Sequence, residues 1–587
     1  MSIGRHETMA VSQHYYYWMI AAMFIMVVVG LAGFRPKSAS HVPSSWLVQS
    51  QTNHTQQELV ALVGCIGGEV THVLPIINAV GATLNATQVA ELQKDTTLIL
   101  LQDTDVSISH KKEKKEKNKK HDPAVTNPTA SDAVLSTLVG ANLLHEEGIL
   151  GKGVGVAVID TGSWNDEALS EGASRKKRVV FYNAIDDKEG NKKTEDANGH
   201  GTHIAGIVAN SEKMKGETLY YGIAPDASLV IVKSFDDDGV GSYLDVIRGI
   251  EWVVAHKDEH NIRVLNLSFS ATPQSYYWED PLNQAVMRAW EAGIVVVASA
   301  GNTGPGPMTI GVPGNIPYVI TVGAMTDNYT PTDLTDDRIT SFSSAGPTVE
   351  GFVKPEIVAP GGHVLSLLEG KSSIASAYPQ YKVDKKLYTM SGTSQSAAVV
   401  SGIVALMLEA DPDLTPDEVK CRLMDAARLG VDENGNLLWS IFQQGAGLVH
   451  AYNAVHSEAT DCANNGLDIS ADLNSANHFG GPVERDADGN FYLRDADGEL
   501  MAEELLWSGG YFSGAGYFSG AGYFSGAGYF SGAGYFSGAG YFSGAGYFSG
   551  AGYFSGASYS WSEDLELSDE LDMTTATTAI NQWVPQE

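Results

Sequence analysis

Short apolar runs alternate with longer amphipathic stretches through the middle of the chain. The runs at residues 229–233 and 262–268 are typical of buried strands, because they are short and rich in aliphatic side chains. Residues 245–254 and 281–291 follow such runs and have the pattern of helices. Strands that alternate with helices in this way predict an α/β fold, with a mostly parallel sheet covered by helices on both faces.

A long uncharged apolar stretch lies near the beginning of the sequence. Residues 15–34 follow Arg5 and precede Arg35 and Lys37. About twenty apolar residues can span a bilayer, whereas the apolar part of a cleavable signal usually has about 7–15. We therefore predict that residues 1–45 are a signal peptide or a signal anchor, and the sequence leaves both open. No second apolar stretch of this length follows, so we expect the rest of the chain to be soluble and exported.

Residues 46–109 have the pattern of a small α+β module. Residues 58–63 and 97–101 read as strands, residues 87–93 read as a helix, and residues 74–80 have an apolar face. We expect the order strand, helix, helix, strand. A free-standing structural domain is one interpretation of such a module.

A charged low-complexity segment, residues 110–124, follows this module. From His110 to His121 it consists almost entirely of Lys and Glu. Blocks of like charge stay solvated and extended, so we predict an exposed linker that is open to maturation cleavage. A nucleic-acid site is the alternative, but no aromatic or groove-reading motif accompanies the lysines. The net charge of −33 also argues against a nucleic-acid partner.

The last part of the chain is acidic and then repetitive. In the acidic, turn-rich residues 457–506, two Asp-Ala-Asp-Gly loops flank a strand-like stretch at 490–494. These loops hint at calcium but lack the distal Glu ligand, so we favour turns. Residues 507–561 repeat Tyr-Phe-Ser-Gly-Ala-Gly, and residues 562–587 form an acidic tail. A sticky surface that contacts a polymer and an inert spacer are both consistent with the repeats.

The chain has three cysteines, Cys65, Cys421 and Cys462. If residues 46–109 are removed during maturation, the other two remain as an even pair. A disulfide between them would fit an oxidising compartment. Cys421 lies in a helix-like stretch at residues 417–427, so a buried free thiol is the alternative. Neither cysteine resembles part of a metal site.

Four motifs place reactive side chains at the ends of predicted elements. They are Asp160 after the apolar run 156–159, His200 between glycines, Asn302 after the run 294–298, and Ser394 at the start of a buried helix. Each has an ordinary alternative, such as a helix N-cap for Ser394 or a turn for Asn302. We expect His203, one turn after His200, to be structural. Serine is a poor nucleophile unless a base, an orienting carboxylate and an oxyanion donor lie beside it, and these residue types supply all three.

The order Asp, His, Asn, Ser along the chain is that of subtilisin rather than chymotrypsin. Together with Tyr-Gly-Ile-Ala-Pro-Asp-Ala at 221–227 and Asn-Leu-Ser at 266–268, it makes the chain resemble the subtilisin-like serine proteases (subtilases) over roughly residues 131–454. The resemblance implies a subtilisin-like, doubly wound sheet for residues 125–456. It also implies that residues 46–109 are a propeptide, which assists folding and then acts as an intramolecular inhibitor.

The same resemblance implies a serine endopeptidase that is secreted or extracytoplasmic and acts on proteins or peptides. Ser394 would be the nucleophile, His200 the general base and Asp160 the orienting carboxylate. Asn302 and the Ser394 backbone N–H would bind the oxyanion. Catalysis in this family requires no cofactor. Calcium commonly stabilises its members, but no loop of this sequence is specific enough to assign as a calcium site.

Substrate contacts also follow from the resemblance. The residues implied to line the primary specificity pocket are Ser268, Phe269, Ser270, Ala298, Ser299, Ala300 and Gly301, with Gly311 as the floor. Tyr243 resembles the wall of a more distal apolar pocket. No acidic residue lies in these segments. We therefore expect a bulky apolar residue, rather than a basic one, before the scissile bond, although Ser270 replaces a common glycine and would crowd one edge.

Two residues depart from the family pattern after the nucleophile. Gln395 and Ala398 stand where the family often has Met and Pro. Gln395 removes an oxidisable thioether, so we expect activity to be less sensitive to oxidants. Ala398 removes a proline constraint and would shift Ser394 without changing the reaction class. The alternative function is that of a surface-attachment protein, whose protease domain mainly performs processing.

Overall fold

The computed structural model describes residues 43–50, 54–103, 135–174, 179–190, 196–330, 335–431, 437–485 and 491–493, and the backbone of 570–571 and 573–575. Most of the predicted signal segment, the Lys-rich linker and the repeats at 507–561 lie outside the described residues. The predicted acidic tail is described only at the backbone positions just given.

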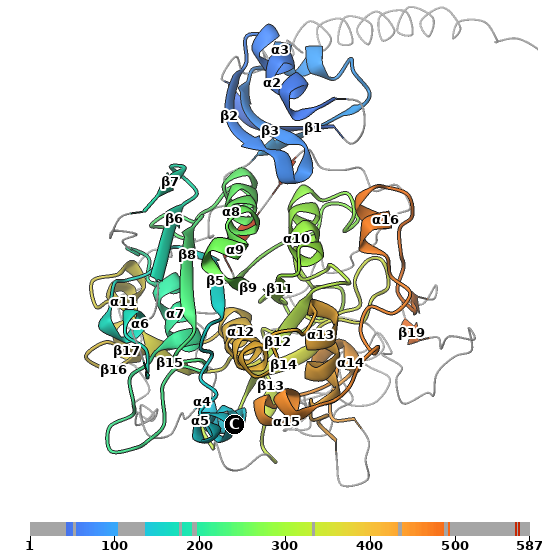
Figure 1. The fold of residues 1–587 in the computed structure, drawn as a ribbon. Coiled ribbons are helices and arrows are strands. Elements are labelled where there is room, and N and C mark those ends of the chain that lie inside the picture. The colour runs from blue at the N-terminus through green and yellow to red at the C-terminus, as the bar shows by residue number, and fades with distance from the viewer. Residues whose placement is uncertain are drawn as a thin grey trace, which may run out of the picture.

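A nine-stranded sheet forms the centre of the molecule (Figure 1). Eight strands lie in the order β13-β12-β11-β9-β5-β8-β6-β7, and β14 also pairs with β12. Their bounds are β5 (Gly155–Asp160), β6 (Val179–Asn183), β7 (Lys188–Glu189), β8 (Ser228–Lys233), β9 (Ile262–Leu267), β11 (Val295–Ser299), β12 (Ile320–Thr326), β13 (Arg338–Ile339) and β14 (Ile357–Pro360). Only β7 and β13 pair antiparallel with their neighbours. The predicted mostly parallel sheet is therefore confirmed.

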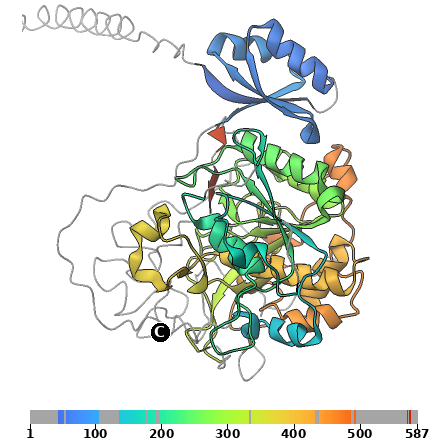
Figure 2. The same cartoon turned by 60° about the vertical axis from the view of Figure 1, so that its left-hand side comes forward.

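Helices cover both faces of this sheet (Figures 1 and 2). On one face α8 (Tyr243–Ala255) contacts α10 (Pro281–Glu291), and on the other α7 (His200–Ala209) contacts α12 (Thr393–Ala410). α12 is buried from Thr393 to Leu408. By length and composition it is the one described helix that could cross a membrane, but its burial inside the fold makes it a core helix.

The remaining helices and strands between residues 135 and 493 are short. The helices are α4 (Leu135–Leu138), α5 (Ala141–Glu147), α6 (Glu167–Ser170), α9 (Lys257–His260), α11 (Ser373–Ala377), α13 (Pro416–Asp425), α14 (Ile441–Gln444), α15 (Ala451–His456), α16 (Ile469–Leu473) and the 3₁₀ turn η2 (Pro379–Tyr381). The strands are β15 (Val364–Leu367), β16 (Lys382–Asp384) and β17 (Leu387–Met390) in one sheet, and β18 (Val483–Arg485) with β19 (Phe491–Leu493) in another. β19 confirms the short strand expected in the acidic segment.

The N-terminal module is a separate antiparallel sheet with the strand order β2-β3-β1-β4. Its elements are β1 (Ser44–Ser50), α2 (Gln56–Cys65), β2 (Glu69–Leu74), the 3₁₀ turn η1 (Pro75–Ile77), β3 (Ala79–Leu84), α3 (Ala86–Leu92) and β4 (Leu98–Asp103). Val48, Leu59, Val80 and their neighbours form a core of its own. The expected α+β character is confirmed, and so are the helix at 87–93 and the last strand.

Two element predictions in this module were wrong. Residues 58–63 lie in helix α2, because Thr55 and Glu58 form a capping box and only one face, at Leu59 and Val63, is buried. Residues 74–80 are not a helix but the end of β2, the turn η1 and the start of β3. Apolar runs this short do not distinguish a strand from a buried helix face.

The module packs on α8 and α10 (Figures 1 and 2). The Gln49 side-chain amide donates to Gln284 Oε1 of α10 at 2.6 Å. His72 Nε2 lies 3.1 Å from Asp245 Oδ1 of α8. The contact therefore combines a buried amide pair with a partly buried contact between a histidine and a carboxylate.

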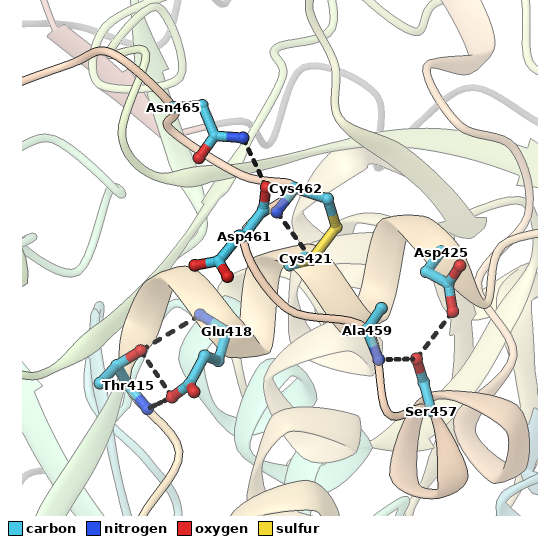
Figure 3. Close-up of a disulfide and its surroundings, with 9 residues drawn as sticks. All are labelled: Thr415, Glu418, Cys421, Asp425, Ser457, Ala459, Asp461, Cys462 and Asn465. Carbon is cyan, nitrogen blue, oxygen red and sulfur yellow. Dashed lines mark hydrogen bonds between the residues drawn. A yellow bond between two sulfur atoms is a disulfide. The ribbon is translucent and has the colours of Figure 1, made fainter.

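A disulfide joins Cys421 of α13 to Cys462 (Figure 3). This settles the alternative that Cys421 is a free thiol. The two residues are 41 positions apart, and closing a loop of that size stabilises a fold by about 2–4 kcal/mol. Nearby, the Ser457 hydroxyl donates to Asp425 Oδ2 at 2.7 Å and holds the returning chain on the same helix. Cys65 is a free, exposed thiol.

Two short strands come from the end of the chain. The backbone of β21 (Met573–Thr575) pairs antiparallel with β10 (Phe269–Ala271), and β20 (Glu570–Leu571) pairs parallel with β4. Within the described chain β21 is the one named strand that pairs with β10. The outer edge of β10 therefore accepts an added strand.

Candidate active site

Asp160 and His200 form a buried pair at the carboxyl edge of the central sheet. Asp160 ends β5, and His200 is the first residue of α7. His200 Nδ1 lies 2.7 Å from Asp160 Oδ1 and 2.9 Å from Oδ2, and both side chains are almost fully buried. A ring whose Nδ1–H donates to a carboxylate keeps Nε2 as a proton acceptor. Nε2 is buried and has no hydrogen-bond partner among the described residues.

Glycines allow the turn after Asp160 to lie close to the first turn of α7. A Cβ atom on Gly201 would lie 2.1 Å from the Gly162 carbonyl oxygen. The turn after Asp160 therefore touches the first turn of α7 at a distance that only glycine permits.

A second buried carboxylate, Asp196, ties the same two segments together. Its Oδ1 accepts hydrogen bonds from Thr161 Oγ1 at 2.8 Å and from the Gly199 backbone N–H at 2.7 Å. Its Oδ2 accepts from the N–H and the hydroxyl of Thr202 at 2.8 and 2.6 Å. Sequence reasoning missed Asp196. The sequence feature that could have identified Asp196 is an acidic residue four positions before a histidine in a glycine-rich motif.

Ser394 is the second residue of α12, where backbone N–H groups have no partner within the helix. Its prediction at the first turn of a buried helix is confirmed. Its hydroxyl donates to the Ser268 carbonyl oxygen at 3.0 Å, and the Ser268 hydroxyl donates back to the Ser394 carbonyl at 3.0 Å. α12 contacts α7, so Ser394 and His200 lie on neighbouring helices.

Asn302 lies in the loop after β11 and is tied to the residue before Ser394. Its Oδ1 accepts from the backbone N–H and the hydroxyl of Thr393, both at 3.0 Å. The Thr393 hydroxyl in turn accepts from the Gly301 N–H at 3.2 Å. This orients the Asn302 amide with its NH₂ group away from Thr393. Sequence reasoning had not singled out Thr393.

The two residues that depart from the family pattern are both fully buried. Ala398 lies in the second turn of α12. Gln395 is buried beside Ser394, and neither its Oε1 nor its Nε2 has a hydrogen-bond partner among the described residues. An unpaired buried amide is unusual and lowers stability.

The segments predicted to contact substrate are held together. The Ser299 hydroxyl donates to the Phe269 carbonyl at 2.9 Å, and the Gly311 N–H donates to the Ala300 carbonyl at 3.1 Å. Ser268, Ser270, Ala298 and Gly301 belong to the same two stretches and so lie in this group. Tyr243 is buried at the start of α8, and its hydroxyl donates to Asp280 Oδ2 at 3.2 Å. Its role as a pocket wall stays a prediction.

Burial changes the pKa of two ionisable side chains, those of His203 and Asp280. Desolvation lowers the pKa of His203, which lies within the core on α7, to about 3. Its Nε2 lies 3.1 Å from the Tyr388 carbonyl oxygen, so His203 is a neutral structural residue, as expected. Desolvation raises the pKa of Asp280 to about 6, although this carboxylate caps α10 by accepting from the Leu282 and Asn283 N–H groups.

The described residues contain no group of three or more His, Cys, Asp or Glu side chains placed to hold a metal ion. The Asp-rich loops at 486–489 and 495–498 lie outside the described residues. The structure therefore adds no calcium ligand to the prediction.

The chain is similar to several known proteins. A sequence model described as "Subtilase family" matches residues 151–461. The chain is 42% identical over 315 residues to serine protease AprX of Bacillus subtilis (strain 168), which covers 52% of this chain and 67% of that protein. It is 30% identical over 393 residues to subtilisin E of the same organism, covering 66% of this chain and 83% of subtilisin E.

A solved structure is similar as well. Fervidolysin from Fervidobacterium pennivorans, described as a keratinolytic enzyme related to subtilisin, superposes with a TM-score of 0.52 at 22% identity. The match covers 72% of this chain and 62% of the fervidolysin chain. At this identity the likeness establishes the fold alone.

Proposed function

The chain belongs to the subtilase family of serine proteases, and from this premise we propose that Asp160, His200 and Ser394 are its catalytic triad. The observation that carries the proposal is the buried pair in which both Asp160 oxygens lie within 2.9 Å of His200 Nδ1. A buried carboxylate in this position selects one tautomer of the ring and stabilises the imidazolium that forms during the reaction.

In the proposed reaction Ser394 Oγ attacks the peptide carbonyl carbon, and His200 Nε2 takes the hydroxyl proton. His200 then donates that proton to the leaving amine, and water hydrolyses the acyl-enzyme by the same route in reverse. In the structure the Ser394 hydroxyl donates to Ser268 instead. Catalytic hydrogen bonds often align only when substrate is bound, so the proposal requires the Ser394 hydroxyl to turn toward His200 in the complex.

Asn302 and the Ser394 backbone N–H are the proposed oxyanion donors. Thr393 holds Asn302 Oδ1, and in the proposed reaction the NH₂ group at the other end of the amide donates to the developing negative charge. In subtilisin itself, a relative of this chain, loss of the corresponding asparagine lowers turnover by about 10²–10³. We expect a similar loss for Asn302→Leu.

The proposed substrate site runs along β10. An extended peptide would add to the outer edge of this strand through backbone hydrogen bonds. The antiparallel pairing of β21 with Phe269–Ala271 supports this, because it shows a chain segment docked on that edge.

The N-terminal module is the proposed propeptide and intramolecular inhibitor. It has its own core, and it contacts the catalytic domain through α8 and α10. We also propose that the mature enzyme works outside the cytoplasm. The disulfide between Cys421 and Cys462 supports this, because disulfides form and persist in oxidising compartments.

The test is to express residues 46–587 as wild type and as Ser394→Ala, and to follow intact mass and hydrolysis of a peptide amide. We expect only the wild type to lose mass near the Lys-rich linker and to cleave the peptide. A well-folded wild type that does neither would exclude the proposed triad. The masses also show whether the repeats remain on the mature enzyme, which the surface-attachment alternative requires.

A further inference from the structure

Three segments surround the place proposed for the side chain before the scissile bond: β10, the stretch from Ala298 to Gly301, and Gly311. Backbone hydrogen bonds fix them to each other. Ala271 and Val312 exchange N–H···O bonds of 2.9 and 2.8 Å, and Gly311 donates to Ala300 at 3.1 Å. The width of the space between them is therefore set by the side chains that point into it.

The Ser270 hydroxyl lies in that space. A Cβ atom on Gly311 would lie 1.9 Å from Ser270 Oγ, and one on Gly301 would lie 2.9 Å from the same oxygen. With a Cα–Cβ bond of about 1.5 Å, Ser270 Oγ is within about 3.4 Å of the Gly311 α-carbon. The hydroxyl therefore contacts one glycine and closely approaches the other, and it fills room that the two glycines leave open.

We propose that Ser270 narrows the primary specificity site, so that the enzyme favours a small residue, such as Ala or Ser, before the scissile bond. This inference rests on the proposed function. It revises the expectation of a bulky apolar residue, which was drawn from the absence of acidic side chains alone. A ring entering beside Ser270 would have to displace the hydroxyl and bury it against carbon, and both steps reduce binding.

The surroundings also favour small polar side chains over charged ones. Ser344 Oγ lies 2.9 Å from the position of a Cβ on Gly301, on the same glycine that faces Ser270. Ser344 is fully buried and contacts Thr303 through its hydroxyl. The site is thus lined by hydroxyl groups, which hydrogen-bond a serine side chain but do not neutralise a lysine or arginine.

The experiment compares mature wild type with Ser270→Gly on peptide amides that differ only in the residue before the scissile bond: Ala, Ser, Leu and Phe. We expect Ser270→Gly to raise the Phe-to-Ala ratio of kcat/KM by about 10-fold or more, the usual effect of one or two heavy atoms in a specificity site. The Phe-to-Ala ratio of Ser270→Ala should lie between those of wild type and Ser270→Gly, because this variant keeps Cβ and removes the hydroxyl.

Thr272→Gly is the matched control. Thr272 is exposed just after β10, so this variant adds a glycine to the same segment without enlarging the site. It should leave the ratio at the wild-type value. A Phe-to-Ala ratio that Ser270→Gly leaves unchanged, or that Thr272→Gly raises equally, would overturn the inference. An enzyme that cleaves none of the four peptides would instead contradict the proposed function.

Discussion

Gln395 shows how one side chain changes the environment of the nucleophile. It is buried next to Ser394, and neither end of its amide has a partner among the described residues. A buried unpaired polar group costs about 1–3 kcal/mol. A methionine of similar volume, the residue common in the family, would avoid that cost but would bring an oxidisable sulfur beside the catalytic serine.

We therefore predict that Gln395→Met raises the free energy of unfolding by about 1–2 kcal/mol. It should also make the active enzyme more sensitive to peroxide. Urea unfolding in the Ser394→Ala background measures the first effect, and residual activity after peroxide treatment measures the second.

Gln444→Met is the matched control for this prediction. Gln444 is also buried, but its amide accepts from the Gly430 N–H and donates to the Trp439 carbonyl. Its replacement should destabilise the fold. If Gln395→Met destabilises to the same extent, Gln395 has partners that the structure does not show.

Asp196 is a second single residue that organises the site. Four donors from Thr161, Gly199 and Thr202 converge on one carboxylate between Asp160 and His200. Asp160, His200, Asn302 and Ser394 could be singled out from the sequence, because each lies in a recognisable motif at the end or the start of a predicted element. The role of Asp196 is not, because it depends on two loops that meet only in the folded chain.

Among the elements, α7 joins the site to the core. It presents His200 at its first residue and buries His203 one turn later against the Tyr388 carbonyl of β17. The pKa of His203 is lowered to about 3 because burial disfavours the charged ring. The unfolded chain takes up a proton near pH 6.5, but the folded chain does not. Stability linked to His203 is therefore full above pH 6.5 and is lost as the pH falls toward 3.

We predict that His203→Gln, made in the Ser394→Ala background, removes part of this acid sensitivity. Between pH 7 and pH 4.5 the parent should lose about 2–3 kcal/mol more unfolding free energy than the variant, at about 1.4 kcal/mol per pH unit below pH 6.5. Urea unfolding at several pH values measures the difference. Other groups, such as Asp280, titrate in both proteins, so their contributions to the difference in unfolding free energy cancel. Parallel pH curves for the two proteins would show that His203 does not control the acid loss.

Element prediction succeeded where the pattern was long and failed where it was short. The helices α8 and α10 and the strands β8 and β9 follow from apolar periodicity over the catalytic domain. Residues 58–63 were predicted as a strand but form part of α2, because a cap at Thr55 and contacts with the module's own sheet favour the helix. A six-residue apolar run carries too little information to choose between a strand and a helix.

At the scale of the whole molecule, the N-terminal module and the catalytic domain meet through few polar pairs. His72 Nε2 lies 3.1 Å from Asp245 Oδ1, and Arg248 binds the same oxygen at 2.6 Å. His72 is largely covered at this contact. Removing its ring would leave a partly buried carboxylate oxygen with one donor fewer.

We predict that His72→Ala weakens inhibition of the mature enzyme by the separately added module about 5- to 30-fold, which corresponds to about 1–2 kcal/mol for a hydrogen bond to a charged group. Inhibition constants measured with a peptide amide test this. Glu69→Ala is the control, because Glu69 lies exposed on the same strand. Equal constants for wild type and His72→Ala would show that apolar packing alone holds the module.

The sequence by itself determined the order of strands and helices in the catalytic domain and the four residues of the proposed catalytic machinery. These depend on local periodicity and on motifs that few residue types satisfy. The tertiary structure decided the pairing of Cys421 with Cys462, the clamp made by Asp196, the contact of His72 with Asp245, and the place of the Ser270 hydroxyl between Gly301 and Gly311. Each of these is a distance between segments far apart in the chain, and such distances are set only when the core packs.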